Sequence, residues 1–152
     1  MTSGPKFNTF IDEAHRFLVI RPIGAMFGAE LVERVMQLYR SLKAPWTYNR
    51  IVDLRRYDGH ITTADLDNAA AAWEEISAGI DYRLSVAMVV RDAYEKLRLP
   101  EISERFPNET ICYFSDYHEA IGWILAEDHS RYLDGLGPIP QRRRDVGAIQ
   151  IE

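Results

Sequence analysis

The chain has 152 residues, enough for one domain whose hydrophobic core needs no disulfide or metal for stability. Apolar residues make up 47% of it and charged residues 27%, which is typical of a globular protein. A net charge of -5 argues against a nucleic-acid-binding protein, because phosphate contacts require a surplus of Lys and Arg. The single cysteine, Cys112, cannot form an internal disulfide and fits a reducing compartment.

The N-terminal segment Met1–Lys6 is short and polar, unlike a secretory signal, and no stretch approaches the roughly 20 apolar residues of a membrane span. We therefore expect a cytoplasmic protein that does not cross a membrane. The basic run Arg142–Arg144 lies in a polar tail and is typical of a solvated segment.

The first half of the chain predicts two strands, a helix and a third strand. In Phe7–Ile11, Phe7, Thr9 and Ile11 alternate with Asn8 and Phe10, which indicates an edge strand. Phe17–Arg21 begins with a continuous apolar run, which indicates a more buried strand. Apolar residues recur at helical spacing from Phe27 to Leu42. The segment Asn49–Leu54 is rich in β-branched residues and predicts a buried strand.

The second half predicts a helix that begins at Thr62, where Asp65 is placed as a capping partner. Further elements are expected at Leu84–Val90 (a buried strand), Asp92–Leu97 and Glu101–Phe106 (short helices), Thr110–Phe114 (a strand), and from Asp116 onward (a helix). This order predicts an α/β domain with a mixed sheet, right-handed crossovers and the strands near residues 17, 50 and 84 in its interior. We expect one domain over residues 1–126 and a tail over 127–152, in which Val146–Ile151 is a candidate late strand.

No cofactor or metal site is predicted. Gly24 and Gly28 precede a helix, but the spacing and lysine of a phosphate-binding loop are missing, so turn chemistry is the better interpretation. The histidines are scattered rather than paired as zinc ligands usually are: His15, His60, His118 and His129.

Ser115, Asp116 and His118 are residue types of a hydrolase, but no glycine-flanked nucleophile turn is present, and a helix cap explains them better. Cys112 lies in an apolar strand and is given no catalytic role. We therefore expect that the protein is not an enzyme. The alternative is a small hydrolase or lyase that uses His60 with Asp58, or His118 with Asp116.

The segment that follows Leu54 is the best candidate for a binding site. It leaves the carboxyl end of an interior strand, where ligands bind in α/β sheets, and it precedes a helix N-terminus, which favours anions. An ordinary solvated loop is the competing interpretation. The candidate ligand- or partner-binding residues are Asp53, Arg55, Arg56, Tyr57, Asp58 and His60.

Four aromatic residues lie close in sequence to this strand and the segment after it: Trp46, Tyr48, Tyr57 and Trp73. They are typical of core and rim packing, and a pocket for an apolar ligand is the alternative.

The order of elements, with the segments 50–66, 84–90 and 111–125, resembles the SpoIIAA-like group of STAS-related domains. The resemblance implies a mixed sheet with helices mainly on one face. It also implies non-enzymatic roles, either regulation through partner proteins or, in some relatives, binding of an apolar or lipid-like ligand.

In regulatory members of that group a serine in an Asp-Ser-Ser-Gly stretch at the start of the second helix is phosphorylated. The resemblance places Thr62 and Thr63 on the two serines, whereas Ile61 and Ala64 depart from the flanking residues. Thr62 is also explained as a helix N-cap.

The leading hypothesis is a non-catalytic STAS-like module that binds a protein partner or a small apolar or anionic ligand along Asp53–Asp65. A homodimer formed through the edge strand Phe7–Ile11 or through Val146–Ile151 is a third hypothesis. A closed apolar cavity between the helices and the sheet would favour ligand binding, and a solid core would favour protein partners.

Overall fold

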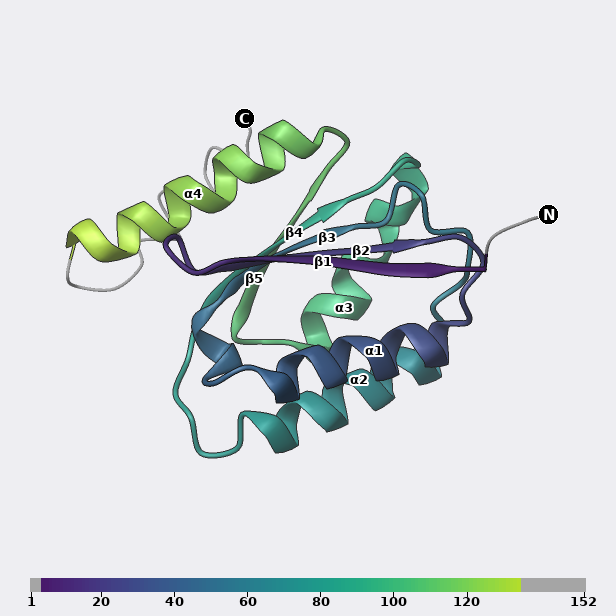
Figure 1. Ribbon diagram of the computed structural model, residues 1–152, viewed down its shortest axis with the longest axis horizontal. Coiled ribbons are helices and arrows are strands. Elements are labelled where there is room, and N and C mark those ends of the chain that lie inside the picture. Colours follow the sequence, from purple (N-terminus) through teal and green to yellow (C-terminus); the bar gives the residue numbers. More distant parts are fainter. Residues whose placement is uncertain (1–3, 135–152) are drawn as a thin grey trace.

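The computed structural model describes residues 4–134, with side chains as far as residue 126. A five-stranded sheet in the order β1-β2-β3-β4-β5 forms its centre (Figure 1). Strand β1 is antiparallel to β2, and the remaining neighbours are parallel. The strands span Lys6–Asp12 (β1), Phe17–Ile23 (β2), Asn49–Asp53 (β3), Leu84–Val89 (β4) and Glu109–Phe114 (β5). The mixed sheet and its three interior strands are thus as the sequence predicts.

Three helices cover one face of the sheet and a fourth covers the other (Figure 1). On the first face lie α1 (Gly28–Ser41), α2 (Thr63–Ile76) and α3 (Leu99–Arg105), and on the second lies α4 (Tyr117–Asp134). Two 3-10 helices, η1 (Pro45–Thr47) and η2 (Ala93–Arg98), connect elements. The helices therefore lie mainly on one face, as expected.

Alternation along β3 divides its side chains between two cores. Arg50 and Val52 face α1 and α2, whereas Ile51 packs in the cluster under α4. Because both faces of β3 are covered, the strand is buried over most of its length, as its β-branched composition indicates.

Local signals fix where the helices begin. Thr62 and Asp65 form a reciprocal capping box at the start of α2, in agreement with the sequence. Gly24 has a φ of +92°, which confirms its role in the turn before α1. A Cβ atom on Gly28 would overlap the Asp65 carboxylate and the His60 carbonyl oxygen, so this glycine lets the N-termini of α1 and α2 approach.

Helix α4 continues to Asp134, into the segment that the sequence assigns to a tail. The basic run Arg142–Arg144 and the candidate strand Val146–Ile151 lie outside the described residues, as does the side chain of His129. Every helix among residues 4–134 is too short or too polar to span a bilayer.

Candidate functional site

The parallel strands β2, β3 and β4 end at the same edge of the sheet, and the candidate residues follow β3 there. The structure divides these residues into three settings. Asp53 pairs with Arg55, which lies against the start of α4, and Tyr57 fills the core beside α1. Arg56, Asp58 and His60 are exposed at the surface.

Asp53 is 2% exposed and is held by two arginines. Arg21 donates from Nε to its carboxylate at 2.9 Å, and Arg55 donates from Nε at 3.0 Å and from Nη2 at 2.9 Å. Burial by itself raises the pKa of this carboxyl, but the hydrogen bonds from Arg55 and Arg21 outweigh it and hold the pKa below its ordinary value. Asp53 therefore joins β2, β3 and the following loop as a charged carboxylate.

Both guanidinium groups also lie over the ring of Tyr117, the first residue of α4. Arg21 is 4.8 Å and Arg55 is 5.7 Å from the ring centroid. Cation–π contacts of this kind contribute about 0.5–1 kcal/mol where partly exposed. The arrangement holds the start of α4 on the sheet, and the charged groups of Asp53 and Arg55 are paired with other protein groups.

Tyr57 is buried between the loop and α1. Its hydroxyl donates to the Met26 carbonyl at 2.9 Å, and burial raises the pKa of the phenol. The loop backbone pairs with Gly24, which donates to the Arg56 carbonyl at 2.9 Å and accepts from the Asp58 N–H at 2.9 Å. These contacts make residues 56–58 a rigid extension of the sheet edge rather than a free loop.

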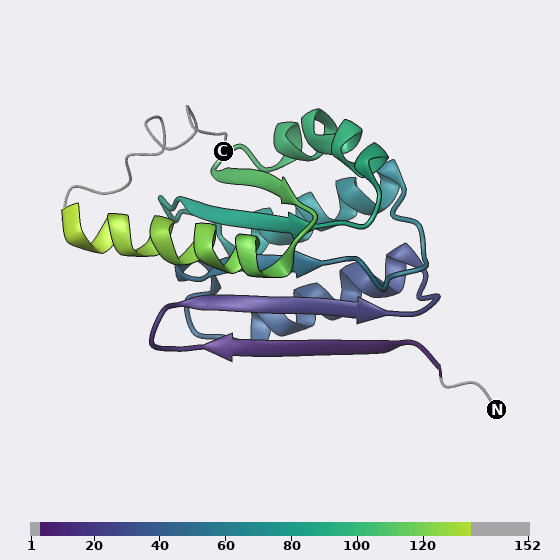
Figure 2. The ribbon, with the colours of Figure 1, turned by 90° about the horizontal axis from the view of Figure 1, so that it is seen from above.

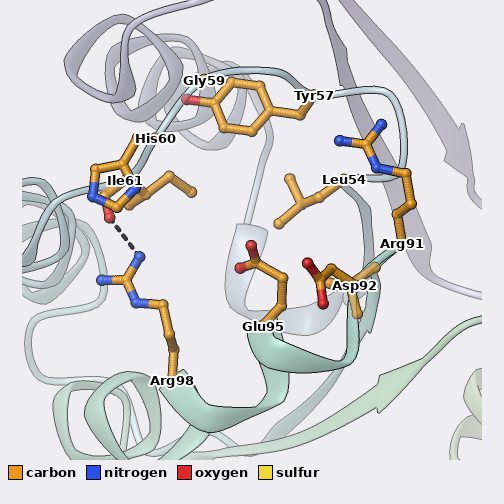
Figure 3. A pocket seen from close by; sticks show the side chains of 10 residues that line it. Leu54, Tyr57, Gly59, His60, Ile61, Arg91, Asp92, Glu95 and Arg98 are labelled. Atoms are coloured by element: carbon orange, nitrogen blue, oxygen red, sulfur yellow. Dashed lines mark hydrogen bonds between the residues drawn. The ribbon is translucent and has the colours of Figure 1, made fainter.

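A polar pocket of about 70 Å³ opens beside this segment (Figure 3). It lies between the loop after β3 and the segment after β4, and its lining comprises Leu54, Tyr57, Gly59, His60, Ile61, Val90, Arg91, Asp92, Glu95 and Arg98. Figure 3 shows Glu95 pointing into the pocket, with Arg98 and His60 on one side and Arg91 on the other.

Two arginines tie the two walls of this pocket together. Arg91 donates to the Arg55 carbonyl at 2.7 Å and lies 3.7 Å from the Asp58 carboxylate, and Arg98 donates to the Ile61 carbonyl. Carboxylates of Asp92 and Glu95 offset these cations, so the pocket does not present the surplus of positive charge that an anion site requires.

The pocket residues that follow β4 or lie in η2 (Val90, Arg91, Asp92, Glu95 and Arg98) are not among those that the sequence singles out, although the sequence carries a signal for them. Leu84–Val90 is predicted to be an interior parallel strand, so the residues after Val90 have to lie beside those after Leu54.

Thr62 and Thr63 are both exposed at the start of α2. The Thr62 hydroxyl accepts from the Asp65 N–H at 3.0 Å, and Thr62 N–H donates to Asp65 at 2.9 Å. Thr63 donates its hydroxyl to Glu101 at 2.5 Å, and Arg98 holds the same carboxylate at 3.0 Å. Each hydroxyl thus has a structural partner in this state of the protein.

A second, apolar cavity of about 150 Å³ lies between the sheet and the helices α1, α2 and α3. Its walls are aliphatic and aromatic, and include Ile20, Leu31, Val32, Val35, Met36, Tyr39, Val52, Leu66, Ala69, Trp73, Val86, Met88, Ile102, Phe106 and Ile111. Leu54 and Ile61 line both this cavity and the polar pocket, so they form the wall between the two. Of the candidate aromatics, Trp73 lines the cavity.

Arg50 and Glu109 also border the cavity and form a buried ion pair. Arg50 Nη1 lies 3.9 Å from Glu109 Oε2, with side-chain exposures of 4% and 5%. Arg50 lies 4.1 Å from the Tyr39 ring centroid and 4.4 Å from that of Trp73, and its Nη2 donates to the Pro45 carbonyl. Burial raises the pKa of Glu109, against the attraction of Arg50.

Among the described residues, neither candidate catalytic pair, His60 with Asp58 or His118 with Asp116, is joined by a hydrogen bond between its two side chains. Asp116 accepts from the backbone N–H of His118 at 2.9 Å, which agrees with its interpretation as a helix cap. Asp58 faces Arg91 rather than His60. The described part of the chain also holds no group of three or more His, Cys, Asp or Glu side chains arranged for a metal ion.

Searches against protein-family models and against curated proteins found no match. Among solved structures, the chain is similar to the crystal structure of an uncharacterized protein from Shewanella loihica PV-4, described as a DUF3478 family member with a SpoIIAA-like fold. The TM-score is 0.57 and the identity 15%, over 82% of this chain and 98% of the other. The chain therefore has the SpoIIAA-like fold that its resemblance to that group predicts.

Proposed function

We propose that this domain is a non-catalytic binding module that holds a compact apolar ligand between α1, α2, α3 and the sheet. The apolar cavity of about 150 Å³ is the observation that carries the proposal. Pockets for small molecules are concave and mostly apolar, with few polar groups, and this cavity has that character. A solid core in the same place would have favoured a protein partner instead.

The volume sets the size of the ligand. An engineered cavity of about 150 Å³ with aliphatic and aromatic walls binds benzene in another protein, so a single ring or a short branched hydrocarbon matches the space. Apolar walls that face an unfilled space lack the packing contacts that a filled core would give them. A ligand that restores the lost contacts therefore gains affinity from the cavity walls themselves.

The candidate residues after β3 act in this proposal as a rim. Tyr57 and the backbone pairing of residues 56–58 hold the segment rigidly, and the segment places Leu54 and Ile61 between the polar pocket and the cavity. A ligand that enters the cavity past Leu54 and Ile61 would pass through the polar pocket first. The charged side chains of Asp53 and Arg55 then stabilise the rim without contacting the ligand.

Thermal unfolding with benzene and toluene as probes tests the proposal. We expect the melting temperature to rise with probe concentration, because a ligand that binds only the folded state stabilises it. Ala69→Leu, which fills the cavity from α2, should abolish that rise. Ala71→Leu makes the same substitution at an exposed position of α2 and should leave the rise intact. No rise in the wild-type protein, or the same rise in Ala69→Leu, would contradict the proposal.

The proposal contains no chemical step. Screening against generic esters and phosphates should show no turnover by the wild-type protein. Turnover that is lost in His60→Gln or His118→Gln would replace the binding role with the hydrolase or lyase alternative.

Binding of a protein partner is the second candidate, and exposed apolar side chains favour it. Phe27, Tyr94 and Leu97 are 83%, 76% and 75% exposed, and all three follow the carboxyl ends of β2 or β4. We expect the double substitution Tyr94→Ser and Leu97→Ser to remove a specifically captured protein, whereas Ile80→Ser retains it. Identical capture by the wild type and both variants would remove this candidate.

A further inference from the structure

Strand β1 forms one open edge of the sheet. It pairs with β2 on one side only, and Figure 2 shows no described element beyond it on the other side. Its outward backbone N–H and C=O groups therefore have no strand to pair with among residues 4–134. Such an edge pairs readily with another strand unless charge, proline or a bulge prevents it.

The β1 sequence is complementary to itself when reversed about Thr9. In an antiparallel pair centred there, Lys6 lies opposite Asp12 of the second copy, and Asp12 lies opposite its Lys6. Phe7 lies opposite Ile11 in the same way. Charges at a sheet edge normally repel an approaching strand, but these two attract a strand of the same sequence.

The two faces of β1 agree with this pairing. Phe7 and Ile11 pack against the cluster that faces α1 and α2, so their pairing across the edge would extend that apolar layer. Asp12 is held in place by the His15 backbone N–H at 2.9 Å and so presents its carboxylate in a fixed position.

Phe10 supplies an independent reason for a second copy. It is 57% exposed although it lies in a strand, and its ring contacts only Phe17 among the described aromatic residues, at 6.5 Å between centroids. In the pair centred on Thr9, Phe10 lies opposite Asn8 of the second copy, so the two Phe10 rings are diagonal neighbours. Diagonal positions are about 7–8 Å apart, within the reach of aromatic side chains.

We propose that β1 pairs antiparallel with β1 of a second copy about Thr9, which gives a symmetric dimer whose two sheets join into one continuous sheet. The dimer does not depend on the ligand proposed above, because the cavity and the β1 edge have no residue in common.

Charge reversal tests the pairing. Sedimentation analysis of the wild-type chain should show a monomer–dimer equilibrium. Lys6→Asp places two pairs of carboxylates opposite each other, and Asp12→Lys places two pairs of ammonium groups opposite each other. Each variant should raise the dissociation constant of the dimer about tenfold, because two attractive cross-strand charge pairs are replaced by two repulsive ones.

An equimolar mixture of the two variants tests whether opposite charges across the strand pair restore the dimer. At positions 6 and 12 the Lys6→Asp chain carries two carboxylates and the Asp12→Lys chain carries two ammonium groups, so every cross-strand pair between them joins opposite charges. The mixture should form a heterodimer at wild-type affinity. Lys96→Asp and Asp81→Lys make the same changes at exposed positions elsewhere and should leave the equilibrium unchanged.

Asp12→Lys removes the hydrogen bond to the His15 N–H in the turn, and so could unfold the protein. Phe10→Ser changes no charge and leaves that turn intact, so it tests the interface independently. It should also weaken the dimer. A wild-type monomer at all concentrations, a dimer insensitive to Lys6→Asp and Phe10→Ser, or folded charge variants that do not combine would overturn the proposal.

Discussion

The guanidinium of Arg50 lies 3.9 Å from the carboxylate of Glu109 in the interior of the domain, where both side chains are almost fully buried. The pair stands at the border of the apolar cavity, and the rings of Tyr39 and Trp73 cover the guanidinium. Two opposite charges in such a place stabilise the fold only as a pair, because each alone would be an uncompensated buried charge.

Replacement of Arg50 by Met should therefore lower the free energy of unfolding by about 3–5 kcal/mol, because it leaves Glu109 buried without its partner. Chemical denaturation measures this loss. The double substitution Arg50→Met with Glu109→Leu should recover most of it, and Arg56→Met at an exposed position should change little. A loss under about 1 kcal/mol in Arg50→Met would show that the pair does not hold this part of the core.

Glu109 should make the folded protein less stable as pH rises. Burial raises the pKa of its carboxyl in the folded state above the ordinary value of 4.5, so the folded protein binds this proton more tightly than the unfolded chain. Its contribution is greatest below that ordinary pKa and declines as pH rises toward the folded-state pKa. Unfolding measured from about pH 4 to 7 should show Glu109→Gln gaining stability relative to the wild type. A constant difference across this range would contradict the raised pKa.

Asp53 should have the opposite dependence. Its pKa in the folded state lies below the ordinary value of 3.8, so its stabilisation is present above that value and is lost as pH falls through the folded-state pKa. Asp53→Asn should lower the free energy of unfolding by about 3 kcal/mol at neutral pH, because Arg21 and Arg55 lose a buried partner. The variant should also lose less stability than the wild type as the pH is lowered below about 4.

The control for that substitution is Asp58→Asn, which removes an exposed carboxylate 3.7 Å from Arg91. It should change the free energy of unfolding by no more than about 0.5 kcal/mol. Equal changes in the free energy of unfolding for the two substitutions would mean that the burial of Asp53 adds nothing to its effect on stability.

Gly59 should not tolerate a side chain. A Cβ atom there would overlap the Met26 carbonyl oxygen and the Tyr57 hydroxyl, which bond to each other at 2.9 Å. We expect Gly59→Ala to destabilise the protein by about 1–3 kcal/mol in denaturant unfolding. Gly122→Ala meets open space within α4 and should instead stabilise it by about 0.5–1 kcal/mol. If both substitutions changed the free energy of unfolding in the same direction, the close packing at Gly59 would be contradicted.

Periodicity and cap chemistry are enough to predict most of the fold. The helical pattern of Phe27–Leu42 differs from α1 by one residue at each end, and the Thr62–Asp65 box forms as expected. The apolar content of Leu84–Val90 places β4 in the interior. Such features depend on neighbours within a few residues, which a single sequence displays directly.

The cavity and the buried ion pair could not be predicted in the same way. Arg50 looks like an ordinary charged residue at a strand start, and its burial depends on Tyr39, Trp73 and Glu109, which come from three other elements. Whether side chains fill the space beneath α2 depends on how their volumes combine across that interface, and no local pattern encodes this.

Methyl-detected NMR with benzene as the probe tests the central claim, that the cavity between the helices and the sheet binds a compact apolar ligand. We predict saturable shifts of the methyl signals of Val35, Met36, Val86 and Met88, which line the cavity, and unchanged signals from Val19 and Ile124 in the cluster under α4. Shifts confined to Val19 and Ile124, or no saturable shift at any of these methyl groups, would contradict the claim.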